Sequence, residues 1–322
     1  MKSIDDIGEW LRSRPGRVRL VGSGSRQTQL PKIDDASLLD FSDCNQIVRL
    51  DPGDQTCTVE SGVTCAELDA ALREHDLELP CLADQASGTI GGLFASDPFG
   101  PAAAGCAGPR NLLLGIDGLL ADGTAFRSGA PVVKSVAGFD VHKLLVGSHG
   151  RLYVAARLHL RLKPRPRFEQ WFANRGLDQD QALTLLHGLR AERQAPTVLQ
   201  LRRERDGSFV VRGRLAGREV HVRAQQRQHG LQPCEALQEF HVAAEPSGEE
   251  VIVGQSLPSA LGDVLEALPQ NAPFAWLGGG RFEAVLPKGT ACDTVLQPPL
   301  DPGEQRLAAG LKQALDPDGT LV

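Results

Sequence analysis

A glycine-rich loop follows the first strand-like segment of the chain and has residue types that can hold an anion. Residues 22–26 have the sequence Gly-Ser-Gly-Ser-Arg and come directly after an alternating segment at residues 17–21. Glycine lets backbone N–H groups approach a phosphate, the two serines add hydroxyl donors, and Arg26 adds a positive charge. A tight structural turn explains the same residues, so this loop alone predicts either a phosphate cradle or a turn.

A second glycine cluster favours the phosphate interpretation. Residues 88–92 have the sequence Gly-Thr-Ile-Gly-Gly, and Ser87 precedes them. Two loops of this kind suit a ligand with an extended pyrophosphate, whereas the alternative is two unrelated turns. On the first interpretation a side chain at Gly91 projects into the pyrophosphate path, so we expect Gly91→Asp to abolish cofactor binding and to leave the fold largely intact.

The first loop departs from the fingerprint of nicotinamide dinucleotide sites. That fingerprint needs G-x-G-x-x-G at the start of a helix, with an acidic residue roughly 20 positions later. Gln27 stands where the third glycine should be, and residues 25–31 contain Pro31 and lack helical periodicity. We therefore reject an NAD site.

The segments around the two loops alternate between strand and helix signals. Thr64 and Glu67 form a capping-box pattern that predicts the start of a helix. Asp122 and Gly123 predict the turn of a hairpin, and Gly147 is expected to end a short helix that begins at Asp140. A helix is also expected over residues 3–11, and strands are expected over residues 17–21, 37–41, 47–50, 56–60, 112–120 and 153–162.

The pattern changes after a Lys-Pro-Arg-Pro stretch at residues 163–166, which indicates a domain boundary. Beyond it we expect helices over residues 177–193, 259–268 and 304–315, and strands over residues 197–201, 208–212, 219–223 and 282–286 and near residue 275. Mixed helices and strands in both halves predict the α+β class. Arginines concentrate at residues 202–223, where we expect a solvated strand surface or a clamp for a substrate carboxylate.

An ordered series of motifs in the first half resembles the FAD-binding domain of the vanillyl-alcohol oxidase and p-cresol methylhydroxylase type. It is most similar to the FAD-binding E subunit of bacterial glycolate oxidase. The resemblance covers about residues 17–164, with a further short match at residues 315–319. The matching segments, in family order, are residues 22–26, 38–42, 59–64, 88–92, 99–101, 110–115, 132–140 and 147–150.

The resemblance implies a two-lobed protein, in which an FAD-binding PCMH-type nucleotide domain is joined to an α+β cap domain. It implies an FAD-binding domain over residues 1–165, a cap or substrate domain over residues 166–300, and a C-terminal helix at 301–322 that returns to the FAD domain. Positions 135, 139 and 153, where this chain has Ser135, Phe139 and Tyr153, depart from the family pattern. The implied cofactor-binding residues are Gly22, Ser23, Gly24, Ser25, Arg26, Gly88, Thr89, Gly91, Gly92, Gly100, Arg110 and Val154.

The same resemblance implies oxidation of a small 2-hydroxy acid such as glycolate. A base would take the hydroxyl proton while hydride passes to the flavin, but the sequence names no base. The FAD is expected to be non-covalent, because residues 22–27 contain no histidine or cysteine. Electrons are expected to leave through an iron–sulfur protein among other glycolate-oxidase-like subunits. The alternative is a non-catalytic assembly subunit of the same fold that has lost the flavin. UDP-N-acetylmuramate reductase also shares this fold and a similar Gly-Ser loop, but it does not usually carry the motif seen here at residues 132–138, which favours the oxidase interpretation.

Composition excludes several other classes of protein. The 322 residues carry a net charge of −6, which argues against nucleic-acid binding. No apolar run reaches the roughly 18 residues of a membrane span. Seven cysteines without a C-x-x-C pair, and histidines without metal-pair spacing, predict neither disulfides nor a metal or iron–sulfur site in this chain. We expect a cytoplasmic protein, with membrane association only through partners. His142 and His149 could lie near a flavin edge, but we expect ordinary surface or turn histidines.

Overall fold

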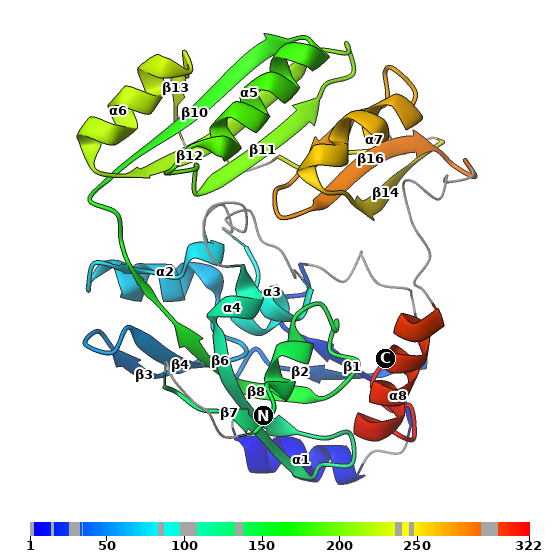
Figure 1. Cartoon of the computed structure of the whole chain (residues 1–322). Helices are drawn as coiled ribbons and strands as arrows, with labels where there is room; N and C mark the ends of the chain where they lie inside the picture. Colours follow the sequence, from blue (N-terminus) through cyan, green and yellow to red (C-terminus); the bar gives the residue numbers. More distant parts are fainter. Residues whose placement is uncertain are drawn as a thin grey trace. The chain divides into compact units, whose positions relative to one another are not determined.

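The computed structural model in Figure 1 describes residues 3–13, 16–25, 33, 35–82, 87–96, 108–132, 138–235, 240–244, 248–290 and 302–322. The chain divides into two compact units. The first contains the described parts of residues 1–98, 109–165 and 300–322, and the second contains Gly108 and the described parts of residues 166–299. Helices and strands are mixed in both units, so the predicted α+β class is confirmed.

The first unit is built on a five-stranded antiparallel sheet with the strand order β3-β4-β8-β6-β7. The central strands are almost fully buried because both of their faces are covered. Beside this sheet, β1 and β2 pair in parallel, and Leu321 near the end of the chain adds a parallel bridge to Val18 of β1. The strands of this unit are β1 (Val18–Val21), β2 (Ser37–Asp40), β3 (Ile47–Asp51), β4 (Thr56–Glu60), β5 (Leu77–Glu78), β6 (Leu113–Leu119), β7 (Ala125–Gly129), β8 (Val154–Arg161) and β9 (Lys163–Pro164).

Local sequence chemistry explains where the elements of the first unit begin and end. The Thr64 hydroxyl accepts from the Glu67 amide at 3.2 Å, and the Glu67 carboxylate accepts from the Thr64 amide at 3.0 Å. The predicted capping box is therefore confirmed. In the β6–β7 hairpin, the Asp122 carboxylate accepts from the Thr124 amide at 2.8 Å, as the turn signal predicts. The helices are α1 (Ile4–Ser13), α2 (Cys65–Arg73), α3 (Ile90–Ser96), α4 (Pro109–Leu112), α8 (Pro302–Leu315) and the 3-10 helices η2 (Pro80–Leu82) and η4 (Val141–Leu145).

The second unit is a seven-stranded antiparallel sheet with the order β13-β10-β12-β11-β15-β16-β14. The helices α5, α6 and α7 bury apolar residues in one cluster with the sheet, while a smaller cluster that contains Phe240 lies on the other face. Neighbouring residues Val210 and Val211 belong to different clusters because side chains alternate along a strand. The strands are β10 (Phe168–Leu177), β11 (Val198–Arg203), β12 (Phe209–Gly217), β13 (Pro233–Cys234), β14 (Glu249–Gln255), β15 (Phe274–Trp276) and β16 (Arg281–Pro287); the helices are α5 (Gln179–Ala191), α6 (Glu219–Gln228), η5 (Pro258–Ala260) and α7 (Leu261–Ala267).

Two expectations for the second unit are wrong. Residues 219–223 were expected to form a strand, but they form the start of α6, where Val222 is buried and Val220 is 65% exposed. The arginine-rich strands were expected to be solvated, yet Arg203, Arg212 and Arg214 are all buried. Arg203 donates to the carbonyls of two distant residues in the loop before β15, and Arg214 pairs with Glu169 of β10.

Within the described part of the chain, no helix has both the length and the apolar character that crossing a membrane requires.

Candidate functional site

The first unit contains two adjoining hollows at the carboxyl end of β1, with empty volumes of about 460 and 470 Å³ including the part open to solvent. The two hollows share several lining residues, so they form one continuous depression, which we call the cavity. Seven of the predicted cofactor residues line it: Gly22, Ser23, Gly24, Ser25, Thr89, Gly91 and Gly92.

The first glycine loop presents unused backbone donors to the cavity. A Cβ atom at Gly22 would overlap the side chain of Thr89, so the two predicted loops are in direct contact. Gly24 has φ +74° with open space where a Cβ would stand. Within the described residues, no backbone amide of residues 22–25 donates a hydrogen bond to the protein. These amides are therefore available to an anion.

The second glycine loop is tied to the chain segment before α2. The amides of Ile90 and Gly91 donate to the carbonyls of Val63 and Ser61, at 2.8 and 2.9 Å. The Gly92 amide donates to the Thr89 hydroxyl at 3.2 Å. Because these three amides are already satisfied, the second loop contributes closely packed small residues to the cavity wall, whereas the free donors lie on the first loop.

Ser61 is the residue that connects this second loop to the central sheet. Its hydroxyl donates to the Ala155 carbonyl of β8 at 2.5 Å, and its amide donates to the Ala156 carbonyl at 2.9 Å. A Cβ on Gly91 would lie 2.7 Å from the Ser61 Cβ and 2.9 Å from its carbonyl oxygen. The expectation that a side chain at Gly91 would spare the fold is therefore wrong, because the space that it needs is taken by a fixed backbone.

His149 lines both hollows, although its sequence suggested only a turn. Its amide donates to the Ala95 carbonyl of α3 at 2.8 Å, and its own φ of +52° is unusual for a residue other than glycine. The following residue, Gly150, lies so close to Leu20 that a Cβ would approach the Leu20 Cδ1 at 3.0 Å. The signal that could have found His149 is its place between two glycines in the Gly-Ser-His-Gly motif.

The remaining predicted cofactor residues either do not line the cavity or lie outside the described residues. Gly88 has φ +95°, and its carbonyl accepts from the Cys65 amide. Arg110 is exposed on α4, and Val154 lies in the core cluster with Val18 and Leu39. None of these three lines the cavity, so their contact with a cofactor stays a prediction. Arg26 and Gly100 lie outside the described residues.

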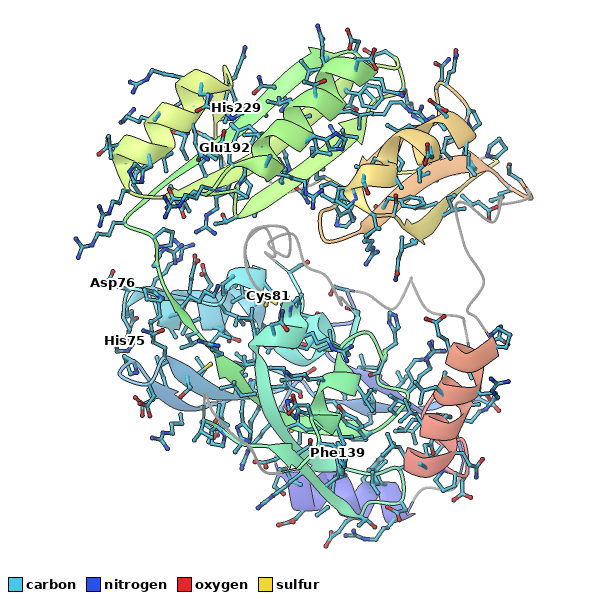
Figure 2. All side chains as sticks on the ribbon, in the orientation of Figure 1. His75, Asp76, Cys81, Phe139, Glu192 and His229 are labelled. Atoms are coloured by element: carbon cyan, nitrogen blue, oxygen red, sulfur yellow. The ribbon has the colours of Figure 1, made fainter. Side chains whose placement is uncertain are left out.

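The three positions that depart from the family pattern do not fill the cavity where they are described. The Tyr153 ring is buried, and its hydroxyl donates to the His142 carbonyl at 2.9 Å. Burial raises the pKa of this phenol and lowers the pKa of His142, which contacts the Ser128 hydroxyl. The Phe139 ring, labelled in Figure 2, is 92% exposed. Ser135 lies outside the described residues.

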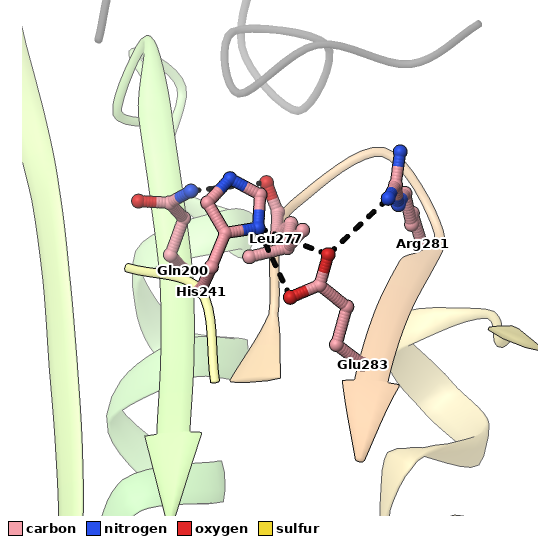
Figure 3. A network of polar contacts seen from close by, with 5 residues as sticks. All are labelled: Gln200, His241, Leu277, Arg281 and Glu283. Atoms are coloured by element: carbon pink, nitrogen blue, oxygen red, sulfur yellow. Dashed lines mark hydrogen bonds and ion pairs between the residues drawn. The ribbon is translucent and has the colours of Figure 1, made fainter. Parts of the chain in front are cut away.

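The second unit holds an oriented histidine that the sequence did not reveal (Figure 3). His241 Nδ1 lies 2.9 and 3.0 Å from the two carboxylate oxygens of Glu283, and Arg281 donates to the same carboxylate at 3.2 Å. Burial acts to raise the pKa of Glu283, but the hydrogen bond with His241 and the positive charge of Arg281 act against it, and the pKa is lowered. A carboxylate on Nδ1 fixes the imidazole so that Nε2 can accept a proton. The network stayed hidden because His241 and Glu283 are 42 positions apart.

Other polar pairs of the described residues have structural roles. Glu192 and His229, both labelled in Figure 2, make a 2.7 Å contact that joins the end of α5 to the end of α6. Gln200 donates to the Leu277 carbonyl and accepts from buried Arg212, whose guanidinium stacks on Phe240 at 4.2 Å. Among the described residues, no three His, Cys, Asp or Glu side chains are grouped to hold a metal ion.

Part of the chain is similar to known FAD-binding proteins. Residues 2–129 match the family model described as an FAD binding domain. The glycolate oxidase subunit GlcE of Escherichia coli is 33% identical over 123 residues, which are 38% of this chain and 35% of that protein. A D-lactate dehydrogenase of Archaeoglobus fulgidus is 32% identical over 120 residues, 37% of this chain and 27% of the relative. The chain thus matches only about a third of the length of these relatives.

A solved structure of alkyldihydroxyacetonephosphate synthase shares the fold. It superposes with a TM-score of 0.70 over 98% of this chain and 73% of its own, at 11% sequence identity. The match therefore covers both units of the chain, whereas the family model matches only residues 2–129. The resemblance stated from the motifs is confirmed.

Proposed function

We propose that the chain is an FAD-dependent oxidoreductase of small 2-hydroxy acids such as glycolate or lactate, because residues 2–129 match the model of an FAD binding domain. The observation that carries the proposal is the cavity, where an amide-rich loop at residues 22–25 meets the small residues of α3. The substrate class is supported by the relatives, which are named as a glycolate oxidase subunit and a D-lactate dehydrogenase.

The residues present fit the cofactor. A pyrophosphate needs several N–H donors and a surface without side-chain obstruction, and the loop of Gly22–Ser25 offers both. Ser23 and Ser25 would add hydroxyl donors, and Thr89 and Gly92 would form the opposite wall. The bound flavin supplies the acceptor for two electrons, while the protein positions it and excludes competing reactions.

Three residues of the chain fix the shape of the cavity. Ser61 joins the start of α3 to β8, Gly62 packs against the backbone of Phe41, and His149 closes the cavity from the loop after η4. Gly62 is required because a Cβ there would overlap the Phe41 carbonyl oxygen. The motif Val-Glu-Ser-Gly-Val-Thr at residues 59–64 thus shapes the cavity.

We also propose that electrons leave through an iron–sulfur partner subunit. The proposal rests on the resemblance to a subunit of glycolate oxidase and on the lack of a C-x-x-C pair in the sequence. We therefore expect weak turnover by the chain alone and stronger turnover when the partner subunits are co-expressed.

The experiment is an absorption spectrum of the purified chain, followed by dye reduction with glycolate and D-lactate with and without the partners. We expect a flavin spectrum with acid-releasable FAD, and turnover with at least one substrate. A folded, colourless chain that takes up no added FAD would instead support the non-catalytic assembly subunit.

A matched pair of variants localises the flavin. Gly24 and Gly176 both have positive φ and both have open space at the Cβ position, but only Gly24 lines the cavity. We expect Gly24→Asp to lose FAD, because the new carboxylate repels the pyrophosphate, and Gly176→Asp to keep it. Equal flavin content in the two variants would remove the first loop from the site.

A further inference from the structure

Lys312 on α8 connects three acceptors through one ammonium group. Its Nζ donates to the Arg151 carbonyl at 2.7 Å, to the Leu321 carbonyl at 2.6 Å and to the Asp316 carboxylate at 2.5 Å. An ammonium has three N–H bonds, so these acceptors use all of them. The Asp316 side chain is fully buried and the Lys312 side chain is one-third exposed.

Two of these acceptors belong to segments that lead directly into the cavity. Arg151 follows His149 and Gly150, which both line the cavity. Leu321 pairs with Val18 at the start of β1, and the far end of β1 supplies the lining residues just before the first glycine loop. The ammonium therefore lies where both lining segments are anchored.

Asp316 fixes the end of the chain to the same strand. Its carboxylate accepts from the amides of Thr320 and Leu321 at 2.9 and 2.8 Å. The Val18 amide then donates to the Thr320 carbonyl at 2.7 Å, and the Val322 amide donates to the Val18 carbonyl at 3.0 Å. The Lys312–Asp316 pair thus holds residues 320–322 beside β1, on the side away from β2.

We propose that Lys312 is a positioning residue for the FAD site, because it holds β1 and the loop of residues 148–151 in the arrangement that the cofactor needs. Without its ammonium, the buried Asp316 carboxylate loses its cation and the two lining segments lose their shared anchor. The proposal rests on FAD binding by the first unit, not on the identity of the substrate.

The test is a titration of the full apo chain with FAD, followed by flavin fluorescence, for wild type and Lys312→Gln. We expect the Kd of Lys312→Gln to rise about tenfold, which corresponds to about 1.4 kcal/mol. The matched control is Arg306→Gln, because Arg306 is exposed on the same helix and the described residues offer it no hydrogen bond or ion pair. Hydrogen exchange should become faster at residues 18–21 and 148–151 in Lys312→Gln only.

A second control separates positioning from general stability. Leu160→Ala removes a buried side chain of β8 outside the cavity, so it should lower the melting temperature and leave the FAD Kd unchanged. If Lys312→Gln is too unstable to titrate, a chain ending at Gly319 serves as the second variant and should also bind FAD about tenfold more weakly.

An unchanged Kd in Lys312→Gln, or an equal loss of affinity in Leu160→Ala, would overturn the proposal. A wild-type chain that binds no FAD would overturn both the cofactor site and this proposal. Binding that depends on Lys312, in a chain that oxidises no 2-hydroxy acid, would support this proposal while the proposed function fails.

Discussion

Gly91→Ala should destabilise the first unit, although alanine is normally the better residue in a helix. Gly91 is the second residue of α3, and its new Cβ would meet the Ser61 Cβ at 2.7 Å and the Ser61 carbonyl oxygen at 2.9 Å. Ser61 cannot move freely because its amide and hydroxyl are bonded to β8. Overpacking of this kind costs typically about 1–3 kcal/mol, against a helix-propensity gain of about 0.5–1 kcal/mol.

The net loss of stability is therefore about 0–2.5 kcal/mol, which lowers the melting temperature of a unit of this size by up to about 10 °C. The measurement is thermal and urea unfolding of wild type and Gly91→Ala. The matched control is Gly310→Ala in α8, where nothing lies within 4 Å of the Cβ position, and it should be neutral or stabilising by up to about 1 kcal/mol. If Gly91→Ala matched Gly310→Ala in stability, the contact with Ser61 would not constrain α3 as we argue.

Three further predictions follow from the buried polar groups. Tyr153→Phe keeps the ring against Phe126 but loses the hydrogen bond to the His142 carbonyl, so the free energy of unfolding in urea should fall by about 1 kcal/mol. An unchanged urea midpoint would mean that this hydrogen bond does not contribute to stability. The folded pKa of Glu283 is lowered, so its contribution to stability is present above its unfolded pKa near 4.5 and is lost as the pH falls through the folded value. Acid unfolding of Glu283→Gln should then depend less steeply on pH than that of wild type, and equal slopes would contradict the assignment. Burial raises the pKa of the Cys57 thiol to about 12. Thiol labelling of the folded chain, followed by mass spectrometry, should therefore modify the partly exposed Cys234 well before the buried Cys57. Early modification of Cys57 would contradict its burial.

The parts of the fold that the sequence predicted correctly are those set by neighbouring residues. The capping box of α2 and the hairpin turn at residues 121–124 depend on side chains within three positions of one another. Residues 219–223 were wrongly predicted to form a strand, because polar and apolar residues alternate in the sequence Glu-Val-His-Val-Arg. In α6, however, only one of its two valines faces the core, and the other is exposed.

The parts of the site that could not be predicted depend on residues far apart in the sequence. The glycines and hydroxyls of the two loops were found because their own residue types suit an anion. The places of Ser61 and His149 were missed because they follow from contacts with β8 and α3. The buried arginines were missed for the same reason, since Arg203 is satisfied by the carbonyls of Ala272 and Pro269.

The pairing of Leu321 with Val18 has a consequence for the order in which the protein matures on the ribosome. The first strand of the cavity is synthesised before the second unit, but its neighbour on one side is made only after the whole second unit. At about 5–20 residues per second, the nascent chain must wait on the order of 15–60 seconds for that neighbour. During this interval the open edge of β1 is available to wrong partners, including the same edge on another nascent chain. The chain is then expected to hold FAD stably only late in its synthesis, after both units have been made.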